Sequence, residues 1–145
     1  MKYQNEQIYN ECLLVSVWNA ARHFKIEVPA INSLQYKELC EKFDCIKDGC
    51  GSIDKEIKRL GMYTEEGVWD INWIKKNIPV EIGIFCGIKK SYHSVLIVNV
   101  FKNKLLLANY AKKRTFWISW QKIKKMAKNK HSEYVDDPTS FKVGV

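Results

Sequence analysis

Three side chains in the 145-residue chain have the types and positions needed for thiol chemistry: Cys12, His93 and Asn109. Cys12 stands at the start of a long apolar segment that is typical of a buried helix. The backbone N–H groups at a helix N-terminus stabilise negative charge, so a thiol there has a lowered pKa and a larger thiolate fraction. The position of Cys12 therefore favours a nucleophilic cysteine.

His93 and Asn109 supply the other two groups that a thiol nucleophile needs. His93 begins the apolar segment 93–101, and Asn109 ends the next one, 104–109. On neighbouring strands the imidazole can reach the thiol, remove its proton and later return it to a leaving amine. The side-chain oxygen of Asn109 can accept the other ring N–H and hold the productive tautomer. The order of the three residues predicts a Cys–His–Asn hydrolase site.

A reaction of this kind also needs hydrogen-bond donors for the oxyanion of its tetrahedral intermediate. The backbone N–H of Cys12 is one such donor, and a glutamine shortly before the nucleophile can supply the second. The sequence offers Gln7 and Gln4. We favour Gln7, because it is the nearer of the two to Cys12 along the chain.

The elements that must position these groups follow from hydrophobic periodicity and capping signals. The helix nearest the candidate nucleophile is apolar on nearly every side, so we expect it to be buried. Before residue 80 the pattern predicts four helices: residues 11–24 capped by Asn10, residues 34–44 with Leu34, Leu39 and Phe43 inward, residues 53–61 after a Ser52 cap and ending on Gly61, and residues 71–78 between Asp70 and Pro79.

After residue 79 the periodicity changes to that of β-strands. It predicts strands over residues 80–86, 93–101, 104–109 and 114–117 and a short helix over residues 121–127. Helices first and strands second favour an α+β domain whose helices pack against one antiparallel sheet. No repeat or linker interrupts the sequence, so residues 1–145 are predicted to form a single domain.

Composition places the chain in the globular class. With 46% hydrophobic residues, seven Gly and three Pro, the sequence is neither low-complexity nor disordered. No segment approaches the roughly 18 apolar residues of a membrane span, and the N-terminus has no apolar signal-peptide region. We therefore expect a soluble cytoplasmic protein whose five cysteines are reduced thiols.

Charge is unevenly distributed along the chain. Residues 86–145 carry 13 basic and 3 acidic side chains, against 11 and 13 in residues 1–85. Such asymmetry is typical of proteins with an acidic partner, whether nucleic acid, an anionic membrane or an acidic protein segment, and equally of a solvated face that only keeps a protein soluble. The basic stretch 111–130 contains aromatic residues, as phosphate-binding surfaces do, but it matches no nucleic-acid module. We therefore favour a peptide or protein partner over nucleic acid.

Three cysteines, Cys40, Cys45 and Cys50, recur at intervals of five residues. Structural zinc sites favour shorter knuckles of the C-x2-C kind, often completed by a nearby histidine, and this segment has neither. We therefore predict reduced thiols here, no metal and no cofactor.

Several segments together resemble one known family. They are Gln7–Leu13 followed by LVSVWNAARHF, Pro79–Ile82, Tyr92–Val98, Leu105–Tyr110 and Ile118–Ile123. In this order they resemble a papain-like cysteine peptidase of the C39 type, the domain that in many bacteria removes double-glycine leader peptides. The resemblance implies a papain-like fold, with Cys12 as nucleophile, His93 as base, Asn109 as the third member and Gln7 in the oxyanion hole.

The sequence also departs from that family at three positions. Glu6 stands where the family commonly has Gln, Glu11-Cys12-Leu13 replaces Asp-Cys-Gly, and Asn109 replaces Asp. Asn is the residue that papain itself uses, so the third departure is compatible with catalysis. The other two motivate a different hypothesis, a catalytically inactive C39-like domain that binds a peptide or an acidic partner.

The leading hypothesis is a thiol hydrolase that cleaves a peptide or isopeptide bond through an acyl-enzyme on Cys12, with His93 as base. A papain-like amidase or acyltransferase acting on a non-protein substrate would use the same site, and it is kept as an alternative beside the inactive binding domain. His93 and Asn109 lie in the basic part of the chain and Cys12 in the slightly acidic part. We expect the two parts to form opposite walls of one cleft that is biased toward acidic substrates.

Overall fold

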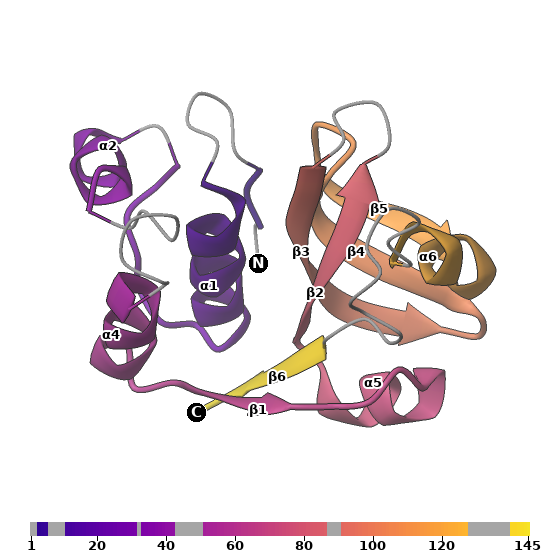
Figure 1. Ribbon diagram of the computed structural model, residues 1–145. Coiled ribbons are helices and arrows are strands. Elements are labelled where there is room, and N and C mark those ends of the chain that lie inside the picture. Colours follow the sequence, from indigo (N-terminus) through magenta and orange to yellow (C-terminus); the bar gives the residue numbers. More distant parts are fainter. Residues whose placement is uncertain (1–2, 6–10, 32, 43–50, 87–90, 128–139) are drawn as a thin grey trace.

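The computed structural model describes residues 3–5, 11–31, 33–42, 51–86, 91–127 and 140–145, with the backbone alone at 85–86, 91–92 and 127. This part of the chain contains helices and strands arranged as Figure 1 shows. Their bounds are α1 Cys12–His23, α2 Leu34–Cys40, α4 Gly51–Arg59, β1 Tyr63–Glu66, α5 Ile71–Asn77, β2 Val80–Cys86, β3 Ser91–Phe101, β4 Lys104–Tyr110, β5 Lys113–Ser119, α6 Trp120–Ala127 and β6 Ser140–Gly144.

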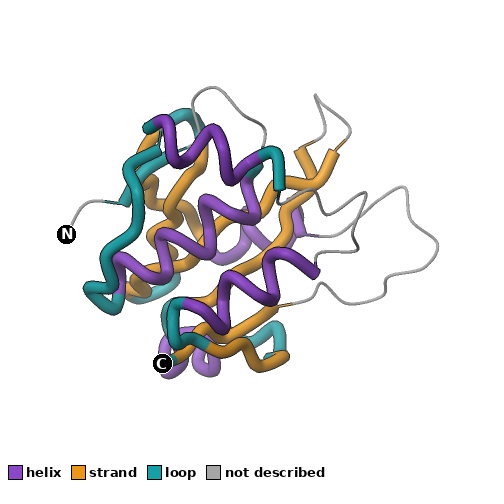
Figure 2. Tube along the Cα trace, turned by 90° about the vertical axis from the view of Figure 1, so that its left-hand side faces the viewer, coloured by secondary structure: helices purple, strands orange, loops and turns teal. Residues whose placement is uncertain are grey.

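The strands form one antiparallel sheet in the order β1-β6-β2-β3-β4-β5. Helix α1 packs on one face of this sheet, against β3 and β4, and α6 packs against β2 on the other side. Figure 1 shows α2 and α4 beyond α1, and the quarter-turn of Figure 2 brings these helices in front of the strands. The arrangement confirms the predicted α+β domain with helices packed on an antiparallel sheet.

Helix α1 is the centre of one hydrophobic core. All eight residues from Leu14 to Ala21 are buried, because the helix lies between the sheet and the outer helices. A helix in this position needs small or apolar residues on every side, which is what its sequence provides. The predicted cap at Asn10 is wrong: the N-cap position is Glu11, with no side-chain capping bond, and Asn10 lies outside the described residues.

A second core lies on the opposite face of the sheet, under α5 and α6. Alternation along β3 divides its residues between the two cores, since successive side chains of a strand point to opposite faces. Leu96 and Val98 pack with α1, whereas Val95 and Ile97 join the second core. Strand β3 is therefore a shared wall, and its position is fixed from both sides.

The structure corrects part of the inward face predicted for the helix at residues 34–44: Leu39 packs against the core around α1 as predicted, Leu34 does not, and Phe43 lies outside the described residues. Helix α2 ends at Cys40, Leu34 is 71% exposed, and the buried residues are Tyr36 and Cys40. The Ser33 hydroxyl accepts the Tyr36 N–H, which sets where the first turn begins. With that phase Tyr36 packs on Trp18 of α1 and Leu34 faces outward.

Other predicted elements are confirmed, and two strands were not predicted. Strand β2 has the predicted bounds, and Asp70 caps α5. Helix α4 ends before a turn at Gly61 with φ 72, but the predicted Ser52 cap is wrong, because the helix begins at Gly51 and Ser52 lies within its first turn. The unpredicted strands are β1 and β6, which pair with each other at the edge of the sheet. No helix in the described ranges is long and apolar enough to cross a membrane.

Candidate active site

Cys12 is the first residue of α1 and is half-buried. Its Sγ accepts a hydrogen bond from the backbone N–H of Ser94 at 3.3 Å. Sulfur makes longer hydrogen bonds than oxygen does, and the N–H dipole adds to the field of the helix N-terminus in favouring negative charge on sulfur. The thiol is thus placed between the start of α1 and the first part of β3.

His93 directly precedes Ser94 on β3, so its imidazole lies beside the residue that binds Cys12 Sγ. The ring Nε2 is 2.6 Å from the main-chain oxygen of Asn109. A carbonyl oxygen only accepts, so Nε2 carries the proton of this hydrogen bond. In the neutral imidazole the proton-free nitrogen is then Nδ1, the ring nitrogen that can accept a proton.

Asn109 holds His93 through its backbone, whereas the sequence had indicated its side-chain oxygen. Asn109 is 3% exposed and has φ 67, in the left-handed region that Asn tolerates better than most residues. It comes directly after the β3–β4 pair Leu96–Ala108, and the β4–β5 pairs Ala108–Thr115 and Tyr110–Lys113 flank it. Its backbone departs from the ladder there, and its carbonyl oxygen meets the His93 ring instead of a neighbouring strand.

The two glutamines considered as oxyanion donors differ in their placement. The backbone of Gln4 exchanges two hydrogen bonds with the Asn19 side chain, and its Oε1 accepts the Ile31 N–H at 2.8 Å. Asn19 lies seven residues after Cys12, about 10 Å along the helix axis. Gln4 is therefore committed elsewhere. Gln7 lies outside the described residues, and the N–H of Cys12 stands at the helix start as predicted.

A polar cluster that the sequence reasoning missed lies behind the thiol, with Ser16 and Ser94 buried and Glu81 half-buried. The Ser94 hydroxyl is 2.9 Å from the hydroxyl of Ser16, one turn after Cys12, and 2.8 Å from Oε1 of Glu81 on β2. Burial raises the pKa of Glu81 to about 7, against a smaller lowering by its hydrogen bond with Ser94. The signal in the sequence was a carboxylate and a hydroxyl at inward positions of the apolar segments VEIGIFC and HSVLIVNVF.

A basic turn adjoins the same end of the sheet. Lys112, Lys113 and Arg114 are exposed and join β4 to β5 just after Asn109. Ala111 and Lys112 both have positive φ, which makes the turn tight. The excess of positive charge in the second part of the chain is thus present next to the candidate site.

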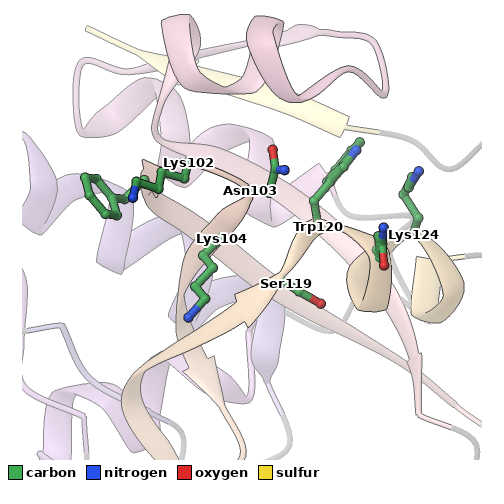
Figure 3. Close-up of a pocket in the computed structure, with 8 residues that line it drawn as sticks. Lys102, Asn103, Lys104, Ser119, Trp120 and Lys124 are labelled. Carbon is green, nitrogen blue, oxygen red and sulfur yellow. The ribbon is translucent and has the colours of Figure 1, made fainter.

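A cavity of about 580 Å³ lies elsewhere, at the tip of the β3–β4 hairpin and the start of α6. Figure 3 shows Lys102, Asn103 and Lys104 from the hairpin opposite Trp120 and Lys124. Since β3 runs from His93 at one end to this hairpin at the other, the cavity is remote from the thiol. It is therefore no part of the candidate active site.

The segment with regularly spaced cysteines is described only in part. Cys40 is a buried thiol on α2, whereas Cys45 and Cys50 lie outside the described residues. Among the residues that the structure does describe, no group of His, Cys, Asp and Glu side chains is arranged to hold a metal ion.

The structure thus joins the start of α1 to β3 through Cys12 and Ser94, and β3 to the end of β4 through His93 and Asn109. The helices and antiparallel sheet that hold these residues form the α+β fold of C39 peptidase domains. The chain is similar to the peptidase domain of Streptococcus ComA, a bi-functional ABC transporter involved in a quorum sensing pathway. That match has a TM-score of 0.65 and 14% identity, and it covers 99% of this chain and 98% of that one. The peptidase domain of Streptococcus mutans ComA matches with a TM-score of 0.57 and 12% identity over 99% of both chains. No family model matches the sequence, and no curated protein does.

Proposed function

We propose that the chain is a cysteine peptidase that hydrolyses a peptide or isopeptide bond through an acyl-enzyme on Cys12. The observation that carries the proposal is the placement of Cys12 Sγ at the N-terminus of α1, against the strand that presents His93. The hydrogen bond from His93 Nε2 to the Asn109 carbonyl supports it, because it leaves Nδ1 as the base. The fold that the chain shares with ComA peptidase domains agrees with this chemistry.

In the first step, His93 Nδ1 takes the proton of the Cys12 thiol, and Sγ attacks the carbonyl carbon of the substrate. A C–S bond forms while the carbonyl π electrons move onto oxygen. The backbone N–H of Cys12 donates to this oxyanion, and Gln7 is the proposed second donor. The helix N-terminus and the Ser94 N–H stabilise the thiolate before the attack.

In the second step, the tetrahedral intermediate collapses and the C–N bond breaks. The imidazolium of His93 gives its proton to the leaving nitrogen, which departs as a neutral amine. Water then attacks the thioester with His93 again as base, the C–S bond breaks, and the thiol and a carboxylic acid are released. No cofactor is needed for any of these transfers.

The Asn109 carbonyl acts in both steps by fixing the orientation of the ring. It accepts from Nε2 whether the imidazole is neutral or protonated, so His93 keeps Nδ1 directed toward the reaction throughout. A neutral acceptor stabilises the imidazolium less than a carboxylate does. Part of the stabilisation of the ion pair therefore falls to the helix N-terminus.

For the substrate, we propose a peptide with acidic residues that binds beside the β4–β5 turn. The exposed side chains of Lys112, Lys113 and Arg114 support this choice, because they lie next to Asn109 and no acidic side chain occurs in residues 86–127. We further propose that residues 1–145 act as one domain in the cytoplasm.

The test is the rate at which iodoacetamide alkylates each cysteine, followed by mass spectrometry of peptides from the folded protein. We expect Cys12 to react fastest, and His93→Ala to slow that reaction by about 100-fold. His23→Ala is a matched control, because His23 is also half-buried but lies at the far end of α1. Equal rates at all cysteines in the folded protein would overturn the proposal and favour a peptide-binding domain.

A further inference from the structure

Glu81 is a carboxylate in a place where a strand needs an apolar residue. It lies on β2 between two paired strands, opposite Leu96 of β3 and Phe141 of β6. Leu96 packs in the core around α1, so the register places Glu81 on the same face of the sheet as α1. Its partner there is the hydroxyl of Ser94.

The hydroxyl of Ser94 has one proton and two oxygen neighbours, so the charge of Glu81 decides the direction of the hydrogen bonds. An ionised Glu81 only accepts, which requires Ser94 to donate to Glu81 and Ser16 to donate to Ser94. A protonated Glu81 can donate to Ser94 instead. Since the backbone N–H of Ser94 holds Cys12 Sγ, the carboxyl group anchors the side chain of the residue whose main chain binds the nucleophile.

The surroundings of Glu81 contain other groups that titrate or carry charge. From α1 they are the Cys12 thiol and, directly before it, the carboxyl group of Glu11. His93 of β3 is paired with Ile84, whose side chain belongs to the second core, so the register places the His93 side chain on the other face of the sheet. Lys142 of β6 is paired with Val80, whose side chain belongs to the second core, so the register places Lys142 on the other face. Burial dominates, and it raises the pKa of Glu81 into the neutral range.

We propose that Glu81 is a positioning residue for Cys12, and that its carboxyl group sets the reactivity of the thiol through Ser94. The inference rests on the proposed function of Cys12 as nucleophile. An ionised Glu81 adds a negative charge behind the thiolate and disfavours it, whereas a protonated Glu81 removes this repulsion without breaking the contact with Ser94. Compared with a thiol that has no carboxyl group behind it, Cys12 therefore loses no reactivity while Glu81 is protonated, on the acidic side of neutrality, and loses some once Glu81 ionises.

The experiment follows the second-order rate of Cys12 alkylation by iodoacetamide from about pH 5.5 to about pH 9. The wild-type profile is expected to contain an inflection near neutral pH that is absent from Glu81→Gln. At the acidic end the two proteins should react alike, and at about pH 8 the variant should react about threefold faster, as expected for the loss of one nearby charge in a partly screened site. Glu56→Gln is the matched control, a buried carboxylate on α4 that pairs with Arg59 instead.

A second variant keeps the test decisive if Glu81→Gln does not fold. Ser94→Ala removes the hydrogen bond that lowers the pKa of Glu81 and leaves the backbone N–H in place. The inflection should then move to higher pH. The inference would be overturned if, in either folded variant, the alkylation rate of Cys12 changed by the same factor at every pH. It would also be overturned if the pH profile of either variant superimposed on that of the wild type.

The same data separate this inference from the proposed function. Selective, His93-dependent alkylation of Cys12 with no effect of Glu81→Gln would overturn the role of Glu81 alone. Alkylation of Cys12 that is neither selective nor dependent on His93 would overturn the peptidase proposal, and the role of Glu81 with it.

Discussion

At the scale of single residues, the candidate site depends more on main-chain groups than its residue types suggest. The Ser94 N–H binds Cys12 Sγ, and the Asn109 carbonyl binds His93 Nε2. Neither group is altered directly by a change of side chain. Asn109 itself has φ 67, a backbone conformation that few residue types adopt at low cost.

Substitutions at Asn109 should therefore sort by backbone preference. We expect Asn109→Gly to keep the alkylation rate of Cys12 within about threefold of the wild type, because glycine adopts positive φ readily and keeps the carbonyl. Asn109→Val should react much more slowly, since a β-branched residue disfavours this conformation by about 1–2 kcal/mol. If Asn109→Gly slows alkylation as strongly as His93→Ala does, the side chain is the essential group.

Glu81 should also make the stability of the fold depend on pH. Its carboxyl group has a pKa of 4.5 when unperturbed and about 7 in the folded protein. Between these values the folded state binds more protons than the unfolded state. The contribution of Glu81 to the free energy of unfolding is therefore fully present below about pH 4.5 and is lost as the pH rises through about 7. For this group alone the loss is about 3 kcal/mol.

Urea unfolding of wild type and Glu81→Gln at about pH 4.5 and about pH 7.5 measures this contribution. The variant has no group to titrate at this position. We therefore expect the free energy of unfolding of Glu81→Gln, relative to that of the wild type, to be about 3 kcal/mol higher at about pH 7.5 than at about pH 4.5. Glu56→Gln serves as the control for removal of a buried carboxylate. A difference that is the same at both pH values would contradict the expectation.

At the scale of elements, the candidate site residues are held by one helix end and by two strands, β3 and β4, that contribute to both cores. Helix α1 is buried on all sides, and β3 is packed from both faces. Elements at the edge of the molecule, such as α5, contribute to stability without touching the thiol. The two effects should therefore be separable by mutation.

Helix α5 provides such a case, because the Asp70 side chain accepts the Trp73 N–H and caps the helix. Asp70→Ala should lower the free energy of unfolding by about 1 kcal/mol, whereas Asp70→Asn should have little effect, since Asn is an equally good N-cap. Thermal unfolding followed by circular dichroism gives both values. A change in the alkylation rate of Cys12 in either variant would show that α5 influences the site after all.

The elements also show how far sequence can predict this structure. Strand β2 was predictable because Pro79 precedes a segment with apolar residues at every second position, and β3 and β4 are largely apolar. Strand β1 carries no such signal, because its four residues are all exposed. It forms by pairing with β6, which lies more than 70 residues later in the sequence. The phase of α2 was lost because the Ser33 cap and the contact of Tyr36 with Trp18 override a plausible apolar pattern.

The candidate site was predictable to a similar extent. The types and order of Cys12, His93 and Asn109 indicated which segments the fold brings together, since helix starts and strand ends are visible in a sequence. Hydrogen bonds to the main chain carry no signature in residue types, so the roles of Ser94 N–H and the Asn109 carbonyl were not foreseen. The cluster of Glu81 with Ser94 and Ser16 depends on strand register, which only the structure gives.

At the scale of the whole molecule, exposed positive charge gathers on several surfaces, two of which carry three closely spaced basic residues each. One is the β4–β5 turn beside the site, and the other is the exposed side of α6 on the opposite face of the sheet. An acidic substrate of the proposed enzyme should respond to the first surface far more than to the second, because exposed charges interact over about one Debye length.

The two surfaces offer matched triple variants. Reversing Lys112, Lys113 and Arg114 to Glu should reduce kcat/KM for an acidic peptide by about tenfold at low ionic strength, with the deficit shrinking as salt is added. Reversing Lys122, Lys124 and Lys125 to Glu changes the net charge by the same amount and should leave kcat/KM nearly unchanged. Equal losses in both variants would show that net charge matters and the turn does not.

The hydrogen bond between the Ser94 N–H and Cys12 Sγ joins residues that are 82 positions apart. A ribosome therefore completes Cys12 long before it makes the strand whose main chain binds this thiol. If Cys12 is the nucleophile proposed above, a growing chain carries an ordinary cysteine until β3 and β4 have been synthesised and packed on α1. The proposed enzyme would then become active only on completion of its fold, a protection that many proteases obtain from a removable inhibitory segment, and the reactivity of Cys12 would measure how much of the protein has folded.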